Sequence, residues 1–444
     1  MGTWKELSLG RRRFVATAGA GFGASVAGVA LARPALAAPK PEKLLFMADN
    51  APWHGTMMQD AAPAFQKETG IRVEFTQLPD DALIVRYKSE LSAKSSSIDV
   101  AQIGTSWVSW MSPHIEDVTQ LMAKADNPYA ADFGWDDIVP SVRQIGNYDG
   151  KQIGIPYRLT MAILHYQPEV LKQAGFDKPP TTWDEMLKTA IAITKAGDGK
   201  RYGLGFCMRE GPAMTDQWAT FLYSNGGRFY DAKTHEIFVN QPPGIEALQY
   251  YGDLLSKYKV VVPDAVTWEW DEIIAGGQND RYGMTITLAP SGTMLNDPKL
   301  SKTGGRWAWT VAPGAHQPDQ SRTFLSGWSL GVPSYSKNKE WAFAFIQFIA
   351  GRYWSLRSME KGNSPARLSV LQNPEIGKKY GWPPAAAQAV NTAITSPQDP
   401  LYGAMELALR PGISRVVMGE TNAKSALDQV AGNWQRIFRR GASL

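Results

Sequence analysis

The stretch that decides the fold covers residues 150–194 and reads GKQIGIPYRLTMAILHYQPEVLKQAGFDKPPTTWDEMLKTAIAIT. Apolar residues alternate with small or polar ones over residues 153–157, as expected of an extended strand. Residues 168–174 then have helical character, and Gly175 stands where a helix usually ends. The stretch therefore predicts strands followed by a first helix.

A second helix is predicted directly downstream. Thr182 is followed three residues later by Glu185, which is the spacing of a capping box. An apolar-periodic run then continues through Met186, Leu187, Ala190 and Ile191. Residues 150–194 thus predict the order strand, tight connection, strand, helix, turn, helix.

The preceding part of the chain alternates short apolar strands with amphipathic helices. Strands are predicted near residues 44–47, 71–75 and 98–103, and helices near 57–70 and 80–94. This β-α-β-α-β order predicts an α/β protein with a doubly wound sheet. Further strands are predicted at residues 282–288 and 307–311, with helices at 244–257 and 423–438.

Two later runs complete the pattern. Residues 324–351 read FLSGWSLGVPSYSKNKEWAFAFIQFIAG, and residues 362–367 read GNSPAR. Together with residues 150–194, these runs resemble the crossover segments of the extracellular solute-binding proteins that serve ABC sugar importers, the maltose-binding-protein-like family. The resemblance implies two lobes of the type II periplasmic-binding-protein fold, joined by two or three crossover strands, with the ligand held between them.

The same resemblance implies lobe boundaries. After a cleaved signal peptide expected over residues 1–37, residues 38–155 with 316–361 would form the N-terminal lobe. Residues 156–315 with 362–444 would form the C-terminal lobe.

The N-terminus predicts export. Three arginines, Arg11 to Arg13, precede a weakly apolar, glycine-containing run, and Ala35-Leu36-Ala37 has the pattern of a cleavage site. The paired arginines resemble a twin-arginine (Tat) signal, although Gly10 stands where Ser or Thr is usual. A transmembrane anchor is the alternative interpretation, which the glycines in the run disfavour. We expect a periplasmic protein with its signal peptide removed.

Composition limits the classes of partner. The net charge is +4 with acidic and basic residues interspersed, which favours neither nucleic acid nor a polybasic membrane contact. Tryptophan is as frequent as tyrosine and phenylalanine, at 16 each, and this surplus suits a protein that stacks indoles on sugar faces. We expect a monomer that binds a small carbohydrate and contacts the ABC permease subunits.

Catalytic and metal-binding patterns are scarce. The five histidines lack metal-ligand spacing, and no G-x-S-x-G elbow occurs. The single cysteine, Cys207, lies between Phe206 and Met208 and is expected in a core. We therefore expect no catalytic residue, metal or cofactor. Any two carboxylates could still form a glycosidase pair, so an exported glycoside hydrolase stays open.

Candidate ligand contacts come first from strand ends, because ligands in open α/β sheets lie beyond the carboxyl ends of the strands. Asp49 and Asn50 end the first predicted strand and precede Trp53 and His54. Thr105 and two further candidates, Ser106 and Trp107, follow the third. An N-cap or an ion pair is the structural alternative for Asp49.

The remaining candidates follow from the resemblance. Tyr157 and Arg158 would face the floor of the cleft, unless Arg158 forms an ion pair at the hinge. Ser291 stands where the family has a Gly-x-Trp that is missing here, and Trp328 is a compensating aromatic platform. The other candidates lie in the second lobe or on the third crossover: Asp216, Trp218, Trp268 and Arg367.

The sequence thus predicts the periplasmic substrate-binding component of an ABC transporter for a carbohydrate. The alternatives are a binder of a non-sugar solute, such as a polyol phosphate or a polyamine, and the exported hydrolase.

Overall fold

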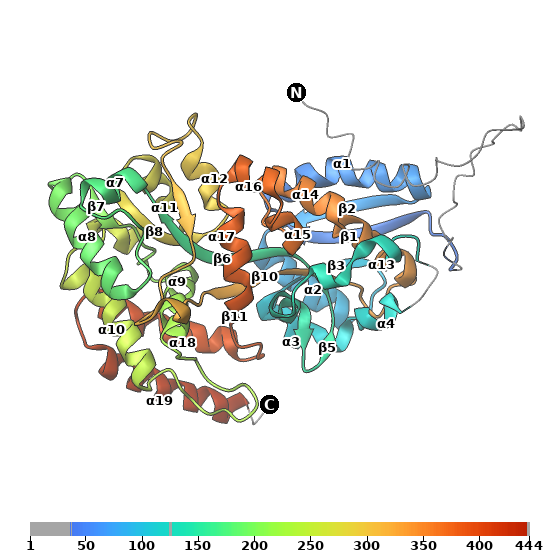
Figure 1. Ribbon diagram of the computed structural model, residues 1–444. Coiled ribbons are helices and arrows are strands. Elements are labelled where there is room, and N and C mark those ends of the chain that lie inside the picture. The colour runs from blue at the N-terminus through green and yellow to red at the C-terminus, as the bar shows by residue number, and fades with distance from the viewer. Residues whose placement is uncertain (1–35, 37, 124–126, 442–444) are drawn as a thin grey trace, which may run out of the picture.

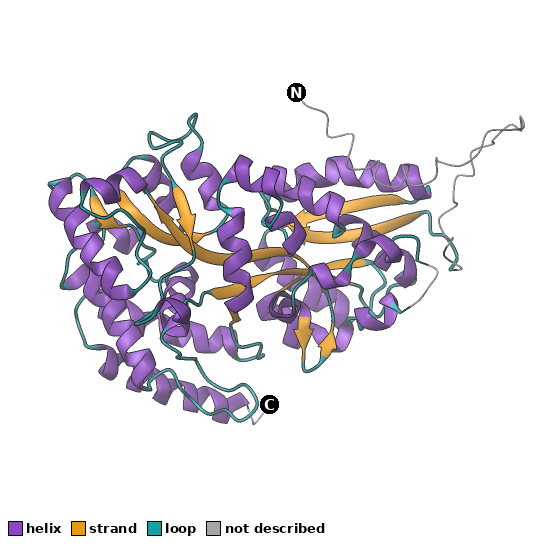
Figure 2. Ribbon diagram, in the orientation of Figure 1, coloured by secondary structure: helices purple, strands orange, loops and turns teal. Residues whose placement is uncertain are grey.

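A computed structural model describes residues 36, 38–123 and 127–441, and Figures 1 and 2 show two α/β lobes joined by long central strands. The predicted two-lobed α/β fold is confirmed. The predicted signal segment lies outside the described residues, except for Leu36. Among the described helices, none is long and apolar enough to cross a membrane.

The first lobe begins with the predicted β-α-β-α-β order. Gly70 ends its first helix with a left-handed φ of 74°, which glycine adopts without a steric penalty. Its elements are β1 (Lys43–Asp49), α1 (Pro52–Thr69), β2 (Arg72–Leu78), α2 (Asp80–Ser92), β3 (Val100–Gly104), α3 (Val108–Met111), α4 (Val118–Met122), α5 (Ala130–Phe133), α6 (Pro140–Arg143), β4 (Asn147–Tyr148) and β5 (Lys151–Gln152). Helices α13 (Lys339–Ile349) and α14 (Arg352–Glu360) return to it late in the chain.

The second lobe is built on the next part of the chain. The Thr182 side chain accepts a hydrogen bond from the Glu185 backbone N–H at 3.3 Å, as the capping-box spacing predicts. Its elements are α7 (Pro168–Gln173), α8 (Trp183–Gly197), β7 (Tyr202–Leu204), α9 (Pro212–Ser224), α10 (Pro242–Ser256), α11 (Trp270–Gln278), β8 (Tyr282–Leu288), α12 (Ser291–Asn296), β9 (Ala308–Thr310), α18 (Tyr402–Val417) and α19 (Ala423–Gly441).

Two long strands carry the chain between the lobes, β6 (Ile155–Tyr166) and β10 (Phe324–Gly331), and they pair antiparallel in the middle of the molecule (Figure 1). The sheet order is β2-β1-β3-β10-β6-β8-β7, with β9 added to β6 and the short β11 (Ile394–Thr395) added to β10. The third crossover, residues 362–367, is not a strand. It contacts β6 through the hydrogen bond from the Leu159 N–H to the Ser364 carbonyl.

Each lobe has its own buried core, and the segment that follows the third crossover contacts both lobes. The resemblance places residues 362–390 in the C-terminal lobe. Helices α15 (Leu368–Leu371), α16 (Pro374–Tyr380) and α17 (Pro383–Ala389) bury apolar side chains in the core cluster of the first lobe. Trp382, directly before α17, donates its indole N–H to the Thr293 hydroxyl of α12 in the second lobe at 2.9 Å. Only after residue 400 does the chain rejoin the second core, beginning with Tyr402. Short proline-initiated helices carry no sequence signal for which lobe they cover.

Arg367 anchors this returning segment to the first lobe. The side chain is 1 % exposed, its Nε donates to the Ala350 carbonyl at 2.6 Å, and one Nη lies 3.3 Å from an Asp137 carboxylate oxygen. Burial alone would raise the pKa of Asp137, but hydrogen bonds from Ser369 and the charge of Arg367 outweigh burial and lower it. Arg367 therefore contributes to folding.

Replacing Arg367 by alanine should lower the free energy of unfolding by about 3–5 kcal/mol, because it leaves the partly buried Asp137 carboxylate without its cation and the Ala350 carbonyl without its donor. Urea unfolding followed by circular dichroism measures the loss. Arg352→Ala is the control, since this 70 % exposed side chain faces the same carboxylate at 3.9 Å and should cost less than about 1 kcal/mol. Equal losses from the two variants would contradict the anchoring role.

Candidate functional site

The crossover strands β6 and β10 are more exposed on one side of the pair than on the other, and this more exposed side is called the floor. On β10, Ser326 and Trp328 are partly exposed while the residues around them are buried, and on β6 the same holds for Arg158 and Thr160. In the ladder, Ser326 opposes Thr160 and Trp328 opposes Arg158. These four side chains therefore share one face, because side chains two apart on a strand point to the same side.

A β-bulge interrupts this ladder at Tyr157. Trp328 opposes Arg158 and Ser329 opposes Pro156, so Tyr157 is an extra residue on β6. Two consecutive side chains then reach the same group of residues, although regular alternation would separate them. The Tyr157 hydroxyl lies 3.3 Å from His54 Nε2, and Arg158 Nη1 lies 3.0 Å from Asp49 Oδ2.

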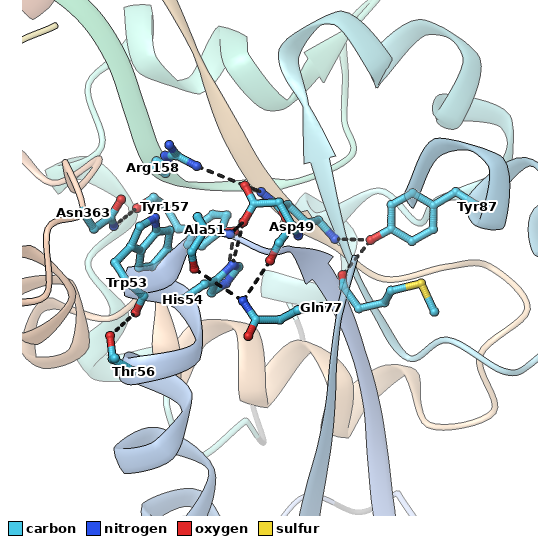
Figure 3. A network of polar contacts seen from close by, with 12 residues as sticks. Asp49, Ala51, Trp53, His54, Thr56, Gln77, Tyr87, Tyr157, Arg158 and Asn363 are labelled. Atoms are coloured by element: carbon cyan, nitrogen blue, oxygen red, sulfur yellow. Dashed lines mark hydrogen bonds and ion pairs between the residues drawn. The ribbon is translucent and has the colours of Figure 1, made fainter. Parts of the chain in front are cut away.

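Asp49, at the carboxyl end of β1, is the centre of this polar network (Figure 3). The Gln102 amide on neighbouring β3 donates to Asp49 Oδ2 at 3.0 Å, and its carbonyl accepts from the Asp49 backbone N–H at 2.5 Å. His54 Nδ1 lies 3.2 Å from Asp49 Oδ1, and Arg158 reaches the other oxygen. The network thus joins the end of β1 to the start of α1, to β3 and to the crossover strand.

Burial and hydrogen bonding set the charges of this network. Burial alone would raise the pKa of Asp49, but the hydrogen bond with His54, the charge of Arg158 and the Gln102 amide together lower it. Burial is the main cause that lowers the pKa of His54, and the Asp49 charge opposes it only partly. Near neutral pH the network therefore holds an ionised Asp49, a neutral His54 and a charged Arg158.

Aromatic rings enclose the Arg158 guanidinium. Its central carbon lies 4.5 Å from the centroid of Trp328 and 5.8 Å from that of Trp53, which stacks on His54 at 4.4 Å. The indole N–H groups of Trp53 and Trp328 are buried and have no hydrogen-bond partner among the described residues. Trp328 is thus partly exposed on β10 with an arginine over one face of its ring, and its role as an aromatic platform for a ligand stays a prediction.

A cavity of about 210 Å³ lies between the lobes beside this floor. The first lobe contributes Thr105 and Ser106, β10 contributes Ser326, and the second lobe contributes Asp216 from α9. The rest of its lining comes from three places: Pro212 of α9, Ser396 and Pro397 of the segment before α18, and Tyr402, Gly403 and Glu406 of α18. Two larger hollows, of about 890 and 690 Å³, are lined by the first lobe alone.

The structure brings together eight of the candidates that the sequence indicated. Five of them, Asp49, Trp53, Tyr157, Arg158 and Trp328, form the polar and aromatic network, and three others, Thr105, Ser106 and Asp216, line the cavity. Asn50, a further candidate, is exposed next to Asp49. Trp107 is 9 % exposed, packs edge-on against Tyr87, and covers Gly104.

Four candidates have surroundings that do not open on the cavity. Trp218 is fully buried on α9, where its ring packs against Phe229, and Trp268 is 5 % exposed and packs against Tyr282. Ser291 is 3 % exposed at the start of α12. Arg367 lies in the first core, as described above.

Several residues of the Asp49 network and of the cavity lining were not predicted from the sequence. Gln102 lies inside β3, and Ser326 is part of the quoted crossover run, where its spacing of two from Trp328 indicates a shared face. Tyr402 and Glu406 are four apart on α18 and therefore on one side of that helix. No motif marked α18 as a wall of the cleft.

The described residues contain no group of three or more His, Cys, Asp or Glu side chains that could hold a metal ion. Cys207 is buried, and burial raises the pKa of its thiol well above the usual value. The expectation of a core thiol therefore agrees with its environment.

The fold has two lobes joined by a pair of crossing strands, and a polar cavity lies between the lobes. This arrangement is that of a two-lobed binding protein. Residues 50–352 match the family described as bacterial extracellular solute-binding protein, and the chain belongs to that family.

Relatives and solved structures agree with this assignment. A probable ABC transporter-binding protein of Deinococcus radiodurans is 24% identical over 94% of this chain and 99% of its own length. A mannitol-binding protein of Pseudomonas aeruginosa is 22% identical over 66% of both chains. A sugar-binding protein from Xanthomonas citri has a TM-score of 0.78 at 18% identity, covering 90% of this chain and 98% of its own. A solute-binding protein from Agrobacterium radiobacter K84 in complex with ribitol has a TM-score of 0.74 at 22% identity, covering 90% and 100%.

Replacing Asp49 by asparagine should lower the free energy of unfolding by about 1–3 kcal/mol at pH 7, because Arg158 then lacks its counter-ion. The amide also has one acceptor oxygen where the carboxylate has two, so the contacts with His54 and Gln102 cannot all be kept. Since the pKa of Asp49 is lowered by folding, its stabilisation is complete above the usual aspartate range and is lost as the pH falls below about 4. Urea unfolding at several pH values should therefore show a gap between variant and wild type that closes in acid.

Asp60→Asn is the matched control for this experiment. Asp60 is 64 % exposed on α1 and lies 3.7 Å from Lys361, so its replacement should change stability by no more than about 0.5 kcal/mol. An Asp49 variant as stable as this control would contradict the central place of Asp49 in the network.

Proposed function

We propose that this chain is the periplasmic receptor of an ABC importer and captures a small carbohydrate, a sugar or a polyol, in the cavity between its lobes. The observation that carries the proposal is the composition of that cavity. Four hydroxyl-bearing side chains, Ser106, Ser326, Ser396 and Tyr402, and two carboxylates line it, and both lobes and the crossover strand contribute. Hydroxyls and carboxylates are the groups that read ligand hydroxyls.

Several facts support a carbohydrate over the alternatives. A polyol phosphate calls for clustered arginine or lysine side chains, and no basic side chain lines the cavity among the described residues. The mannitol-binding relative and the ribitol complex show that related chains take small polyols. The family consists of binding proteins, which supports reversible capture without turnover.

Closure of the lobes follows from the same arrangement. A ligand in this cavity touches side chains of both lobes, and only a closed form makes both sets of contacts. We propose that the closed, liganded monomer then docks on the permease.

A panel of sugars and polyols, including D-mannitol, ribitol, D-glucose and maltose, should contain ligands that raise the melting temperature, since binding to the native state stabilises it by mass action. For the ligand with the largest shift, Trp328→Ala should weaken binding in isothermal titration by about 1–3 kcal/mol, because the floor loses an aromatic face and Arg158 loses its support.

Trp328 shares the exposed face of β10 with the lining residue Ser326. Tyr353→Ala provides the control, because Tyr353 is 61 % exposed on α14, away from both that face and the cavity lining. The affinity of the Tyr353→Ala variant for this ligand should equal that of the wild-type protein. Unchanged binding by Trp328→Ala would place the ligand away from the floor, and a panel without any shift would reject a carbohydrate ligand.

We also propose export by the twin-arginine route with cleavage after Ala37, on the basis of the basic, apolar and A-L-A series at the N-terminus. N-terminal sequencing of the protein from the periplasmic fraction should begin at Ala38, and replacement of Arg11 and Arg12 by lysine should hold the precursor in the cytoplasm. An intact Met1 on the periplasmic protein would reject the cleavage, and normal export of the lysine variant would reject the route.

A further inference from the structure

Asp216 has an unusual place in the second lobe. Helix α9 is buried along almost its whole length, and Asp216 is the one residue between Ala213 and Ser224 whose side chain is not fully enclosed. It opens on the cavity between the lobes. No hydrogen-bond or ion-pair partner for its carboxylate occurs among residues 36, 38–123 and 127–441. A charged side chain on such a helix is costly unless something in the cavity pairs with it.

A second carboxylate lines the same cavity. Glu406 on α18 receives two hydrogen bonds from Arg410, at 3.0 and 2.9 Å, and both go to one of its oxygens, Oε1. When Asp216 and Glu406 are both ionised, the three groups carry one uncompensated negative charge. In the first lobe Arg158 compensates the charge of Asp49, whereas in the part of the chain that the structure describes no second cation pairs with Asp216 and Glu406.

Because no cation among the described residues pairs with Asp216, its surroundings raise the pKa of its carboxyl group. Burial, followed by the charge of Glu406, raises the pKa of Asp216 to about 7, and Arg410 opposes this only in part. Two tyrosines also face the carboxyl group, Tyr223 on α9 and Tyr402 on α18. Burial raises the pKa of both hydroxyls, so they stay neutral and supply no charge.

We propose that Asp216 determines ligand specificity by pairing with an ammonium group, so that the cavity takes a hydroxylated primary amine, an amino sugar or an amino polyol, in preference to its neutral hydroxyl analogue. This inference rests on the function proposed above. An ammonium group donates three hydrogen bonds and accepts none, which matches carboxylates that only accept. It also restores the missing positive charge, and charge-assisted hydrogen bonds are about twice as strong as neutral ones.

The lining residues other than the two carboxylates determine which groups the ligand carries besides its amine. Hydroxyls from Ser106, Ser326, Ser396 and Tyr402 surround the carboxylates, so the ligand must carry hydroxyl groups beside its amine. An unbranched polyamine has methylene groups in those places, and they would leave the protein hydroxyls without partners. The volume of about 210 Å³ suits a single sugar or polyol unit.

The test compares matched ligands that differ in one group. Isothermal titration measures D-glucamine against D-sorbitol, and D-glucosamine against D-glucose, at pH 6 and pH 8. The ammonium group of D-glucamine stays largely protonated at both pH values, whereas a carboxyl with a pKa of about 7 goes from about one-tenth to about nine-tenths ionised over this range. The amine of D-glucosamine is a weaker base because of the oxygens around it, so the pH dependence is read from D-glucamine alone. The affinity ratio of D-glucamine to D-sorbitol should therefore exceed one at pH 8 and rise about tenfold from pH 6 to pH 8.

Asp216→Asn should abolish both effects, leaving a ratio near one at either pH. Asp271→Asn is the control, an exposed aspartate on α11 of the same lobe and outside the cavity lining, and it should retain the wild-type ratio and its pH dependence. The pH profile of the wild-type protein needs no variant, so the proposal remains testable if Asp216→Asn does not fold.

The outcomes separate this inference from the function on which it rests. Binding of D-sorbitol with a D-glucamine to D-sorbitol ratio at or below one at pH 8, or with no rise of that ratio from pH 6 to pH 8, would overturn the amine specificity and leave the carbohydrate receptor standing. A retained ratio in Asp216→Asn would overturn the role of Asp216. No binding by any of the four ligands or the wider panel would overturn both proposals.

Discussion

The antiparallel pair of β6 and β10 is the contact on which the rest of the molecule depends. Both strands leave one lobe and enter the other, and their pairing makes a single sheet continue through both lobes. The pair tolerates only glycine at position 327, because a Cβ there would lie 2.2 Å from the Arg158 carbonyl oxygen. The Thr105 hydroxyl bonds both backbone polar groups of Gly327 at 3.0 Å, which ties the end of β3 to this crossing point.

The crossing pair also explains where the polar groups gather. Strands β1 and β3 end beside it, so Asp49 and Thr105 meet the exposed face that Arg158, Ser326 and Trp328 provide. The bulge at Tyr157 adds a second side chain from β6 to the Asp49 network. A site assembled on strands and strand ends is held by backbone hydrogen bonds, so its geometry follows from the sheet.

The two walls of the cleft treat charge differently. In the first lobe Asp49 is paired, hydrogen-bonded and ionised, and Arg158 is enclosed by indole rings. In the second lobe Asp216 faces Glu406 across the cavity lining without a cation of its own. The first wall is therefore complete without a ligand, whereas the charge of the second wall is balanced only by a proton or by a bound positive group.

Local patterns in the sequence were enough to predict the α/β class, most strands and helices, the capping box at Thr182 and the helix end at Gly70, because these depend on neighbours a few residues away. The ends of strands also indicated Asp49 and Ser106, since ligand groups follow from strand direction in such sheets. Two crossover residues, Arg158 and Trp328, were indicated by the resemblance of residues 150–194 and 324–351 to crossover segments, and no local pattern singled them out.

Only the tertiary structure determined which side chains are covered by elements that lie far away in the sequence. Trp218 and Asp216 are two residues apart on one helix, yet the first is buried and the second opens on the cavity, because α18 and the crossover strands close over different sides of α9. Helices α15 to α17 cover the first lobe although they follow its last crossover. Glu406 reaches the cavity from a helix about 190 residues beyond Asp216. Contacts at such separations depend on how whole elements pack, and local sequence does not encode that packing.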